Sequence, residues 1–178
     1  MNTSAARSPA FDRAWIARHI PHSGKMCLLD EVVAWSDDAI SCIATSHLDA
    51  DNPLRSNGHL SAVCGAEYAA QAMAVHGAVL GTTKRRPRVG LLASLRNVKL
   101  HVERLDTLKD PLTVHAERIG GDASNVLYRF ALRCGAQQVI TGRAAVIVDA
   151  SSVDPACIGD AGIRPINVEP LVTLIGTA

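Results

Sequence analysis

One stretch, residues 63–80 with the sequence VCGAEYAAQAMAVHGAVL, constrains the fold more than any other part of the chain. It is rich in alanine, has no proline and carries apolar residues on all sides, which predicts a helix buried on most of its surface. Such a helix needs covering elements. We therefore expect the rest of the chain to supply a sheet whose apolar face packs on it.

Strand patterns account for that sheet. Segments with alternating apolar and polar residues, separated by Asp-Pro, Gly-Gly-Asp and Cys-Gly-Ala turns, indicate an antiparallel meander in the second half of the chain. Two earlier segments have the same character, and a short helix is expected over residues 11–18. The prediction is an α+β fold with about six strands around one long helix. The expected strands are residues 28–33, 39–45, 93–102, 112–119, 126–134 and 139–148.

A histidine and a carboxylate lie close together where the long helix begins. The turn dipeptides Asn52-Pro53 and Asn57-Gly58 predict a loop that ends at His59. Glu67 and Gln71, four residues apart, share one helix face, whereas His76 lies on a different flank. A histidine and a carboxylate can together move a proton next to a carbonyl group.

Each of these polar residues also has a simpler interpretation. Burial predicts a raised pKa for Glu67, but a glutamate in the first helical turn can also be favoured by the helix dipole and partly hydrated. His59 can be an exposed loop histidine, and Gln71 can make a capping or cross-helix hydrogen bond. The backbone amides at the helix start are candidates for holding a thioester oxygen, namely those of Val63, Cys64 and Gly65.

Composition and cysteine usage narrow the class of protein. The 178 residues are 48% hydrophobic with a net charge of +1, which suits one compact domain over residues 1–150 and gives no reason to expect nucleic-acid or membrane partners. Five cysteines without a CxxC pair, and no signal segment, indicate the cytoplasm. Cys64 could be a nucleophile at a helix start, but no base for it can be named, and a small buried cysteine is the simpler reading.

Four further features remain, and three of them leave alternatives open. The histidines do not have zinc-binding spacing, so no metal is expected. The basic run over residues 84–88 is either a solvated connector or a contact for an acidic carrier protein or a pantetheine phosphate. Residues 151–178 are either a docking extension or a poorly ordered terminus. His22 is either a structural histidine of the Pro21 turn or a residue that lines a pocket.

Several motifs in order resemble one enzyme family. Residues 52–76, with Asn52, Gly58-His59 and the Glu67-x-x-x-Gln71 pair, resemble the loop and helix of the hotdog-fold 3-hydroxyacyl-ACP dehydratases. The resemblance spans about residues 11–149. The earlier and later matching positions are Pro21, His22, Met26, Leu28, Leu29, Asp30, Val32, Asp106 and Leu108.

Within that superfamily the chain is most similar to a branch of predicted dehydratases found beside aryl polyene and related lipid gene clusters. His59 and Glu67 are only eight positions apart, and Ser61-Ala62 stand where the standard enzymes have Pro-Gly. Members of this branch frequently carry a residue other than histidine at the position of His59.

The resemblance implies a hotdog fold and removal of water from a 3-hydroxyacyl thioester. His59 is then the base and Glu67 the acid, with Val63, Cys64, Gly65, Gln71 and His22 binding the substrate. No cofactor is implied beyond the phosphopantetheine of an acyl carrier protein, which is the expected partner, and the chain is expected to form a homodimer or heterodimer with a hotdog subunit.

Two alternatives remain. One is a non-catalytic or half-site subunit that contributes Glu67 to a site whose histidine comes from a different hotdog protein. The other is an acyl thioesterase in which Glu67 activates water.

Overall fold

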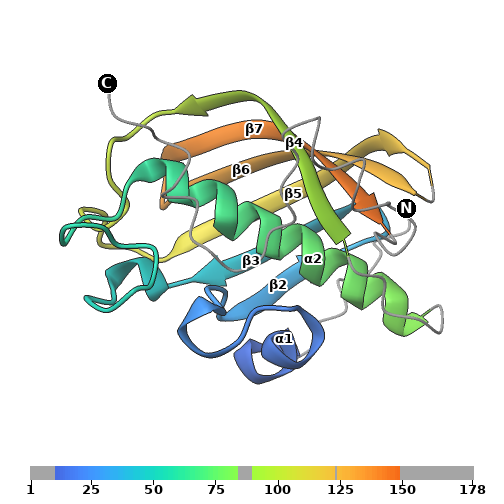
Figure 1. Cartoon of the computed structure of the whole chain (residues 1–178), viewed down its shortest axis with the longest axis horizontal. Coiled ribbons are helices and arrows are strands. Elements are labelled where there is room, and N and C mark those ends of the chain that lie inside the picture. Colours follow the sequence, from blue (N-terminus) through green and yellow to red (C-terminus); the bar gives the residue numbers. More distant parts are fainter. Residues whose placement is uncertain (1–10, 84–89, 123, 149–178) are drawn as a thin grey trace, which may run out of the picture.

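The long helix α2, Gly65–Thr83, lies across one face of an antiparallel sheet in the computed structural model (Figure 1). The structure describes residues 11–83, 90–122 and 124–148. This arrangement is the predicted hotdog fold, in which the sheet wraps a largely apolar helix. The basic run, the boundary at residue 150 and the extension 151–178 lie outside the described residues.

The sheet has seven strands within the described ranges, in the order β1-β2-β3-β5-β6-β7-β4, and every neighbouring pair is antiparallel. The sequence predicted about six, because β1 is only two residues long. The strands are β1 (Phe11–Asp12), β2 (Glu31–Trp35), β3 (Ala39–Ala44), β4 (Gly90–Leu100), β5 (Leu112–Gly121), β6 (Asn125–Cys134) and β7 (Gln137–Val148).

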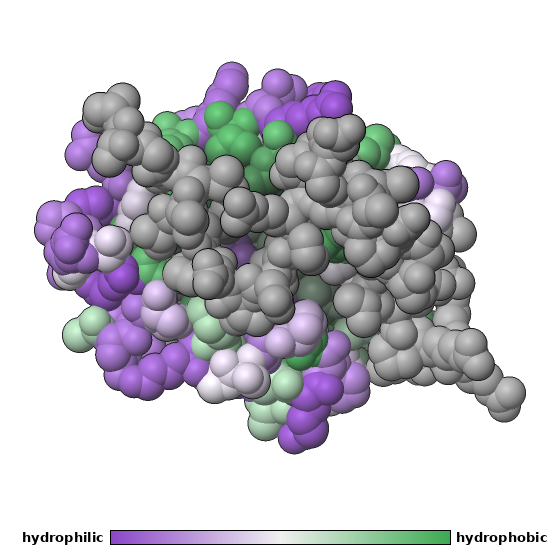
Figure 2. Space-filling model, in the orientation of Figure 1, coloured by the Kyte–Doolittle hydropathy of each residue, from purple (hydrophilic) through white to green (hydrophobic). Residues whose placement is uncertain are grey.

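The predicted meander is correct for β5, β6 and β7 but wrong for β4. This strand lies beyond β7 at the edge of the sheet, while β5 pairs with β3. Alternating apolar residues identify a strand but not its neighbours. Figure 2 shows hydrophobic surface near the upper edge of the molecule, where β4 runs. Val98 and Leu100 of this strand are 37% and 49% exposed.

Two predicted boundaries shift for identifiable reasons. The first helix, α1 (Arg13–His19), begins after residue 11 because Asp12 caps it, its carboxylate accepting a hydrogen bond from the Trp15 amide at 2.8 Å. The strand expected from residue 28 begins instead at Glu31. The Leu28 amide donates to the Gln71 side chain and not to a neighbouring strand.

Helix α2 begins after a short 3₁₀ turn, Ala62–Cys64, and packs on β3, β5 and β6. Its start approaches the sheet so closely that a Cβ on Gly65 would lie 2.7 Å from Ile140 Cγ2. A buried hydroxyl network ties the same helix to the preceding loop, with Tyr68 Oη bonded to Ser46 Oγ and Asn52 Nδ2. None of the described helices has the length and apolar character needed to span a membrane.

Candidate active site

Glu67 carries the candidate site. It stands in the first turn of α2 and is 4% exposed. Both of its side-chain partners meet the same carboxylate oxygen: His22 Nε2 lies 3.1 Å from Oε1, and Gln71 Nε2 donates to Oε1 at 3.0 Å. Within the described part of the chain the second oxygen, Oε2, receives no hydrogen bond. The carboxylate is therefore fixed at one oxygen and open at the other.

Gln71 is a three-way clamp buried from solvent. Its Oε1 accepts a hydrogen bond from the Leu28 amide at 2.9 Å, and its Nε2 donates to the Met26 carbonyl at 2.8 Å as well as to Glu67. The prediction that Glu67 and Gln71 share a helix face is confirmed by their contact. The amide also joins α2 to the segment before β2.

His22 reaches Glu67 from the connection between α1 and the 3₁₀ turn η1, Gly24–Met26. Gly24 has φ of +57°, a left-handed conformation that glycine adopts without strain, and the chain reverses there. The His22 side chain is 13% exposed, and its Nδ1 is buried without a hydrogen-bond partner. His22 therefore contacts Glu67, and its interpretation as a pocket-lining residue stays a prediction.

The expected raised pKa of Glu67 is wrong. Burial does raise it, but hydrogen bonds from His22 and Gln71, with the attraction of a protonated His22, bring the pKa below its ordinary value. Burial of this position can be predicted from the sequence, whereas the two donors cannot. An ionised carboxylate accepts protons, so Glu67 has none to give until another group supplies it.

His59 does not join this group. It is exposed and closes a tight hairpin turn, in which its amide and the Ser56 carbonyl bond at 2.9 Å. Asn57 and Gly58 have φ of +51° and +77°, as the Asn-Gly dipeptide predicts for such a turn. Among the described residues His59 forms no hydrogen bond or ion pair with Glu67, so its role as base stays a prediction.

A partly exposed ion cluster holds the His59 turn in place. Asp106 Oδ1 accepts from the Leu60 amide at 2.9 Å, and its carboxylate pairs with Arg104 and, at 3.6 Å, with Arg55. The Arg104 guanidinium holds the pKa of Asp106 well below its usual range. Arg55 also donates to the Gly58 carbonyl at 3.1 Å. The turn is therefore anchored at both ends.

The amides proposed to bind a thioester oxygen are occupied in this conformation. Val63 donates to Ser61 Oγ, Cys64 to the Ser61 carbonyl, and Gly65 to carbonyls of the preceding turn. Their role in carbonyl binding remains a prediction. Burial raises the pKa of the Cys64 thiol, which points its Sγ–H at the Leu54 carbonyl, as suits a packed cysteine.

The pairing of His22 with Glu67 is the site contact that the sequence did not reveal. The two residues are 45 positions apart, and no periodicity connects them. The available signal was the Pro21-His22 motif ahead of the Leu28-Leu29 pair, which matches the family segment in the resemblance.

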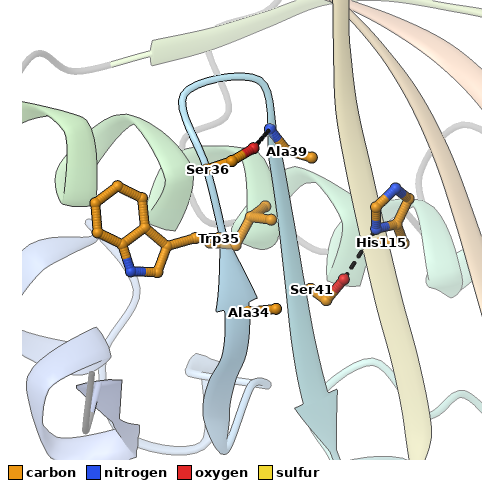
Figure 3. A pocket seen from close by; sticks show the side chains of 7 residues that line it. Ala34, Trp35, Ser36, Ala39, Ser41 and His115 are labelled. Carbon is orange, nitrogen blue, oxygen red and sulfur yellow. Dashed lines mark hydrogen bonds between the residues drawn. The ribbon is translucent and has the colours of Figure 1, made fainter. Parts of the chain in front are cut away.

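A shallow cavity of about 200 Å³ lies elsewhere, between the β2–β3 hairpin and β5 (Figure 3). Ser41 Oγ and His115 Nδ1 bond across it at 2.9 Å, on directly paired positions of β3 and β5. It contains none of the predicted site residues. Within the described ranges no group of three or more metal-binding side chains is arranged to hold an ion.

The family comparison agrees with this fold. The model of the ApeP-like family, described as ApeP dehydratase, matches residues 14–155. The chain therefore belongs to the ApeP dehydratase family, which confirms the resemblance to dehydratases of the aryl polyene branch. Among curated proteins, no sequence matches the chain.

Solved structures share the fold at low identity. A chain of the dehydratase heterocomplex ApeI:P from Xenorhabdus doucetiae is 24% identical, with a TM-score of 0.67 over 75% of this chain and 90% of that chain. A mutant thioesterase from Pseudomonas aeruginosa is 12% identical, with a TM-score of 0.50 over 67% and 80%. A hypothetical thioesterase with coenzyme A from Streptococcus pneumoniae is 12% identical, with a TM-score of 0.50 over 66% and 84%.

Proposed function

We propose that the chain removes water from a 3-hydroxyacyl thioester carried on the phosphopantetheine of an acyl carrier protein, giving the 2-enoyl thioester. The reaction breaks a C–H bond beside the thioester carbonyl and the C–O bond of the 3-hydroxyl. It needs a group that accepts the α-proton and a group that protonates the departing hydroxyl. Membership of a dehydratase family supports this reaction class.

The observation that carries the proposal is the buried carboxylate at the start of α2. Glu67 is buried and is held at Oε1 by two donors, while Oε2 receives no hydrogen bond within the described residues. A carboxylate fixed in this way is placed to exchange protons with a bound thioester. The family pattern offers His59 as the matching imidazole, from a turn that is anchored but exposed.

The position of His59 favours a site shared between two hotdog subunits. An exposed histidine can reach a neighbouring subunit, and among the described residues β4 is an edge strand with exposed Val98 and Leu100. The similar Xenorhabdus structure is a heterocomplex, so we propose a second hotdog subunit as partner. The chain then acts either as a complete dimer or as one half of a mixed site.

Thioester hydrolysis is the second candidate. An ionised carboxylate suits activation of water, and thioesterases are among the proteins of the same fold. The two reactions give different products from one substrate. Dehydration keeps the thioester intact, whereas hydrolysis releases the carrier thiol.

The test follows a 3-hydroxyacyl carrier protein by mass spectrometry, and the reverse hydration of the 2-enoyl form, with the full chain alone and with a second hotdog dehydratase subunit. Wild type, Glu67→Gln and His59→Ala are compared. The matched control is Glu117→Gln, because the side chain of Glu117 on β5 is 44% exposed. We expect Glu67→Gln to lower kcat at least about 100-fold and Glu117→Gln to match wild type.

Dehydration of the substrate by the wild-type chain without a partner establishes a self-sufficient dehydratase. Dehydration only in the mixture with a second subunit establishes the half-site subunit. Loss in His59→Ala then assigns the turn histidine to the reaction. Free carrier thiol without enoyl product moves the function to thioester hydrolysis. Full dehydratase activity in Glu67→Gln contradicts the assigned site.

A further inference from the structure

We propose that Nδ1 of His22 is the general base of this site and that Glu67 is the carboxylate that fixes the tautomer of His22. The inference rests on the proposed function for its substrate, a 3-hydroxyacyl thioester. It rests on the geometry of one chain for everything else.

The tautomer follows from the hydrogen bonds around Glu67. An ionised carboxylate can only accept, and Oε1 already accepts from Gln71 Nε2. The contact of 3.1 Å between Oε1 and His22 Nε2 therefore requires a proton on Nε2. In a neutral imidazole with Nε2–H, the other nitrogen carries a lone pair. Nδ1 of His22 is then a proton acceptor.

That acceptor has no partner. Nδ1 of His22 is buried, and no donor bonds to it in the described structure. A buried polar atom without a partner is rare in folded proteins, and a group that binds during the reaction supplies the missing partner in many functional sites. The His22 side chain as a whole retains 13% exposure, although Nδ1 itself is buried.

The other buried histidines lack this arrangement. Both ring nitrogens of His76 are bonded, Nδ1 to Tyr128 Oη at 2.9 Å and Nε2 to the Ser36 carbonyl at 2.9 Å. His47 forms no ion pair with a carboxylate among the described residues, and the group closest to bonding its ring is the backbone at Asp110. Within the described residues, His22 alone joins a buried carboxylate at one nitrogen and leaves the other nitrogen open.

This pairing assigns complementary roles to the two residues. A carboxylate behind an imidazole orients the ring and stabilises the imidazolium that forms when the ring takes a proton. The lowered pKa of Glu67 agrees with that role, because the carboxylate stays ionised near neutral pH. Gln71 adds a second donor, so the Glu67 carboxylate cannot rotate away from His22.

The proton balance closes within the pair. Nδ1 of His22 takes the α-proton of the 3-hydroxyacyl thioester, and the electron pair of the C–H bond forms the new double bond. The C3–O bond breaks, and the imidazolium returns the proton to the departing hydroxyl as water. The products are the 2-enoyl thioester, one water and the original neutral imidazole, with no other reagent.

The first readout is spectroscopic and independent of activity. The full chain, labelled with ¹⁵N-histidine, is examined by long-range ¹H–¹⁵N correlation at pH 8. The set of imidazole signals that is missing from the spectrum of His22→Gln is assigned to His22. We expect the shift of an unprotonated ring nitrogen at Nδ1 and a protonated nitrogen at Nε2. A proton on Nδ1 in the wild type overturns the proposal, whether or not the chain dehydrates a thioester.

The second readout is kinetic. His22→Gln keeps an amide N–H for Glu67 but has no basic nitrogen, so it preserves the contact and removes the base. We expect kcat to fall at least about 100-fold with KM within about threefold, while His115→Asn at an exposed position of β5 matches wild type. Thermal unfolding of His22→Gln, compared with the wild type and with His22→Asn, checks that the loss of kcat does not come from a folding defect.

The outcomes separate the two proposals. A wild-type chain that dehydrates the thioester while His22→Gln stays within threefold of it overturns the base assignment and leaves the function standing. A chain that shows no dehydration with any hotdog partner overturns the proposed function. In that case the spectrum alone decides the state of His22.

Discussion

At the scale of single residues, Gln71 determines how the site is assembled. It is fully buried, and its amide satisfies the Leu28 N–H, the Met26 carbonyl and Glu67 Oε1 together. A buried backbone group that loses its partner costs about 1–3 kcal/mol. Gln71 therefore couples folding of the segment before β2 to the charge state of the site.

Replacing Gln71 with methionine tests this coupling. The apolar side chain has a similar length but leaves the Leu28 amide and the Met26 carbonyl unpaired, so we expect a loss of about 3 kcal/mol in the free energy of unfolding. The measurement is urea unfolding at neutral pH. Gln137→Met, at the exposed start of β7, is the control and should change stability by less than about 0.5 kcal/mol. Equal small effects would contradict the clamp.

At the scale of elements, the start of α2 sits against the sheet at a position where only glycine fits. A Cβ on Gly65 would approach Ile140 Cγ2 at 2.7 Å and Leu132 Cδ2 at 3.2 Å. The closeness places the first turn, and with it Glu67, at a fixed depth above β6 and β7. Gly65 thus has a packing role, whatever its amide does with a substrate.

The helix offers its own matched pair of glycines for a stability test. Alanine is about 1 kcal/mol better than glycine within a helix, and Gly77 has open space where a Cβ would lie. We expect Gly77→Ala to raise the free energy of unfolding by about 0.5–1 kcal/mol. Gly65→Ala should lower it by about 1–2 kcal/mol, because overpacking outweighs helix propensity. Chemical unfolding measures both changes. Stabilisation in both variants would show that the start of α2 can shift away from the sheet.

At the scale of the whole molecule, the core contains two histidines in addition to the site. His47 and His76 have no exposed surface, and burial lowers the pKa of each, although backbone contacts at Asp110 and Ser36 work in the opposite direction. For His76, protonation would also remove the acceptor that Tyr128 Oη uses. Both histidines are therefore neutral in the folded protein at neutral pH.

Linkage then sets the sign of the pH dependence. The unfolded chain takes up protons on these histidines below about pH 6.5, whereas in the folded chain they stay neutral to lower pH. The free energy of unfolding therefore falls as the pH drops through that value. We expect His47→Met to reduce the loss of Tm between pH 7.5 and pH 5.5 by roughly half, since one of the two groups is removed. His115→Asn, on the exposed sheet face, should retain the wild-type loss. An unchanged loss in His47→Met would contradict the prediction.

The sequence by itself determined the elements and the class of fold. An alanine-rich helix without a polar face must be covered, and segments of alternating residues provide a sheet to cover it, so both periodicities could be read locally. The Asn57-Gly58 turn and the shared face of Glu67 and Gln71 were also readable, because both depend on neighbouring residues. These features follow from local backbone geometry.

Only the tertiary structure decided the order of the strands and the partners of Glu67. The edge position of β4 and the meeting of His22 with Glu67 join segments far apart in the chain, and no local pattern encodes such contacts. The charge state of Glu67 depends on them, because two converging donors outweigh the burial that the sequence indicated. Long-range packing thus fixed the chemistry of the site, since a pKa is set by the groups in contact and not by their order in the chain.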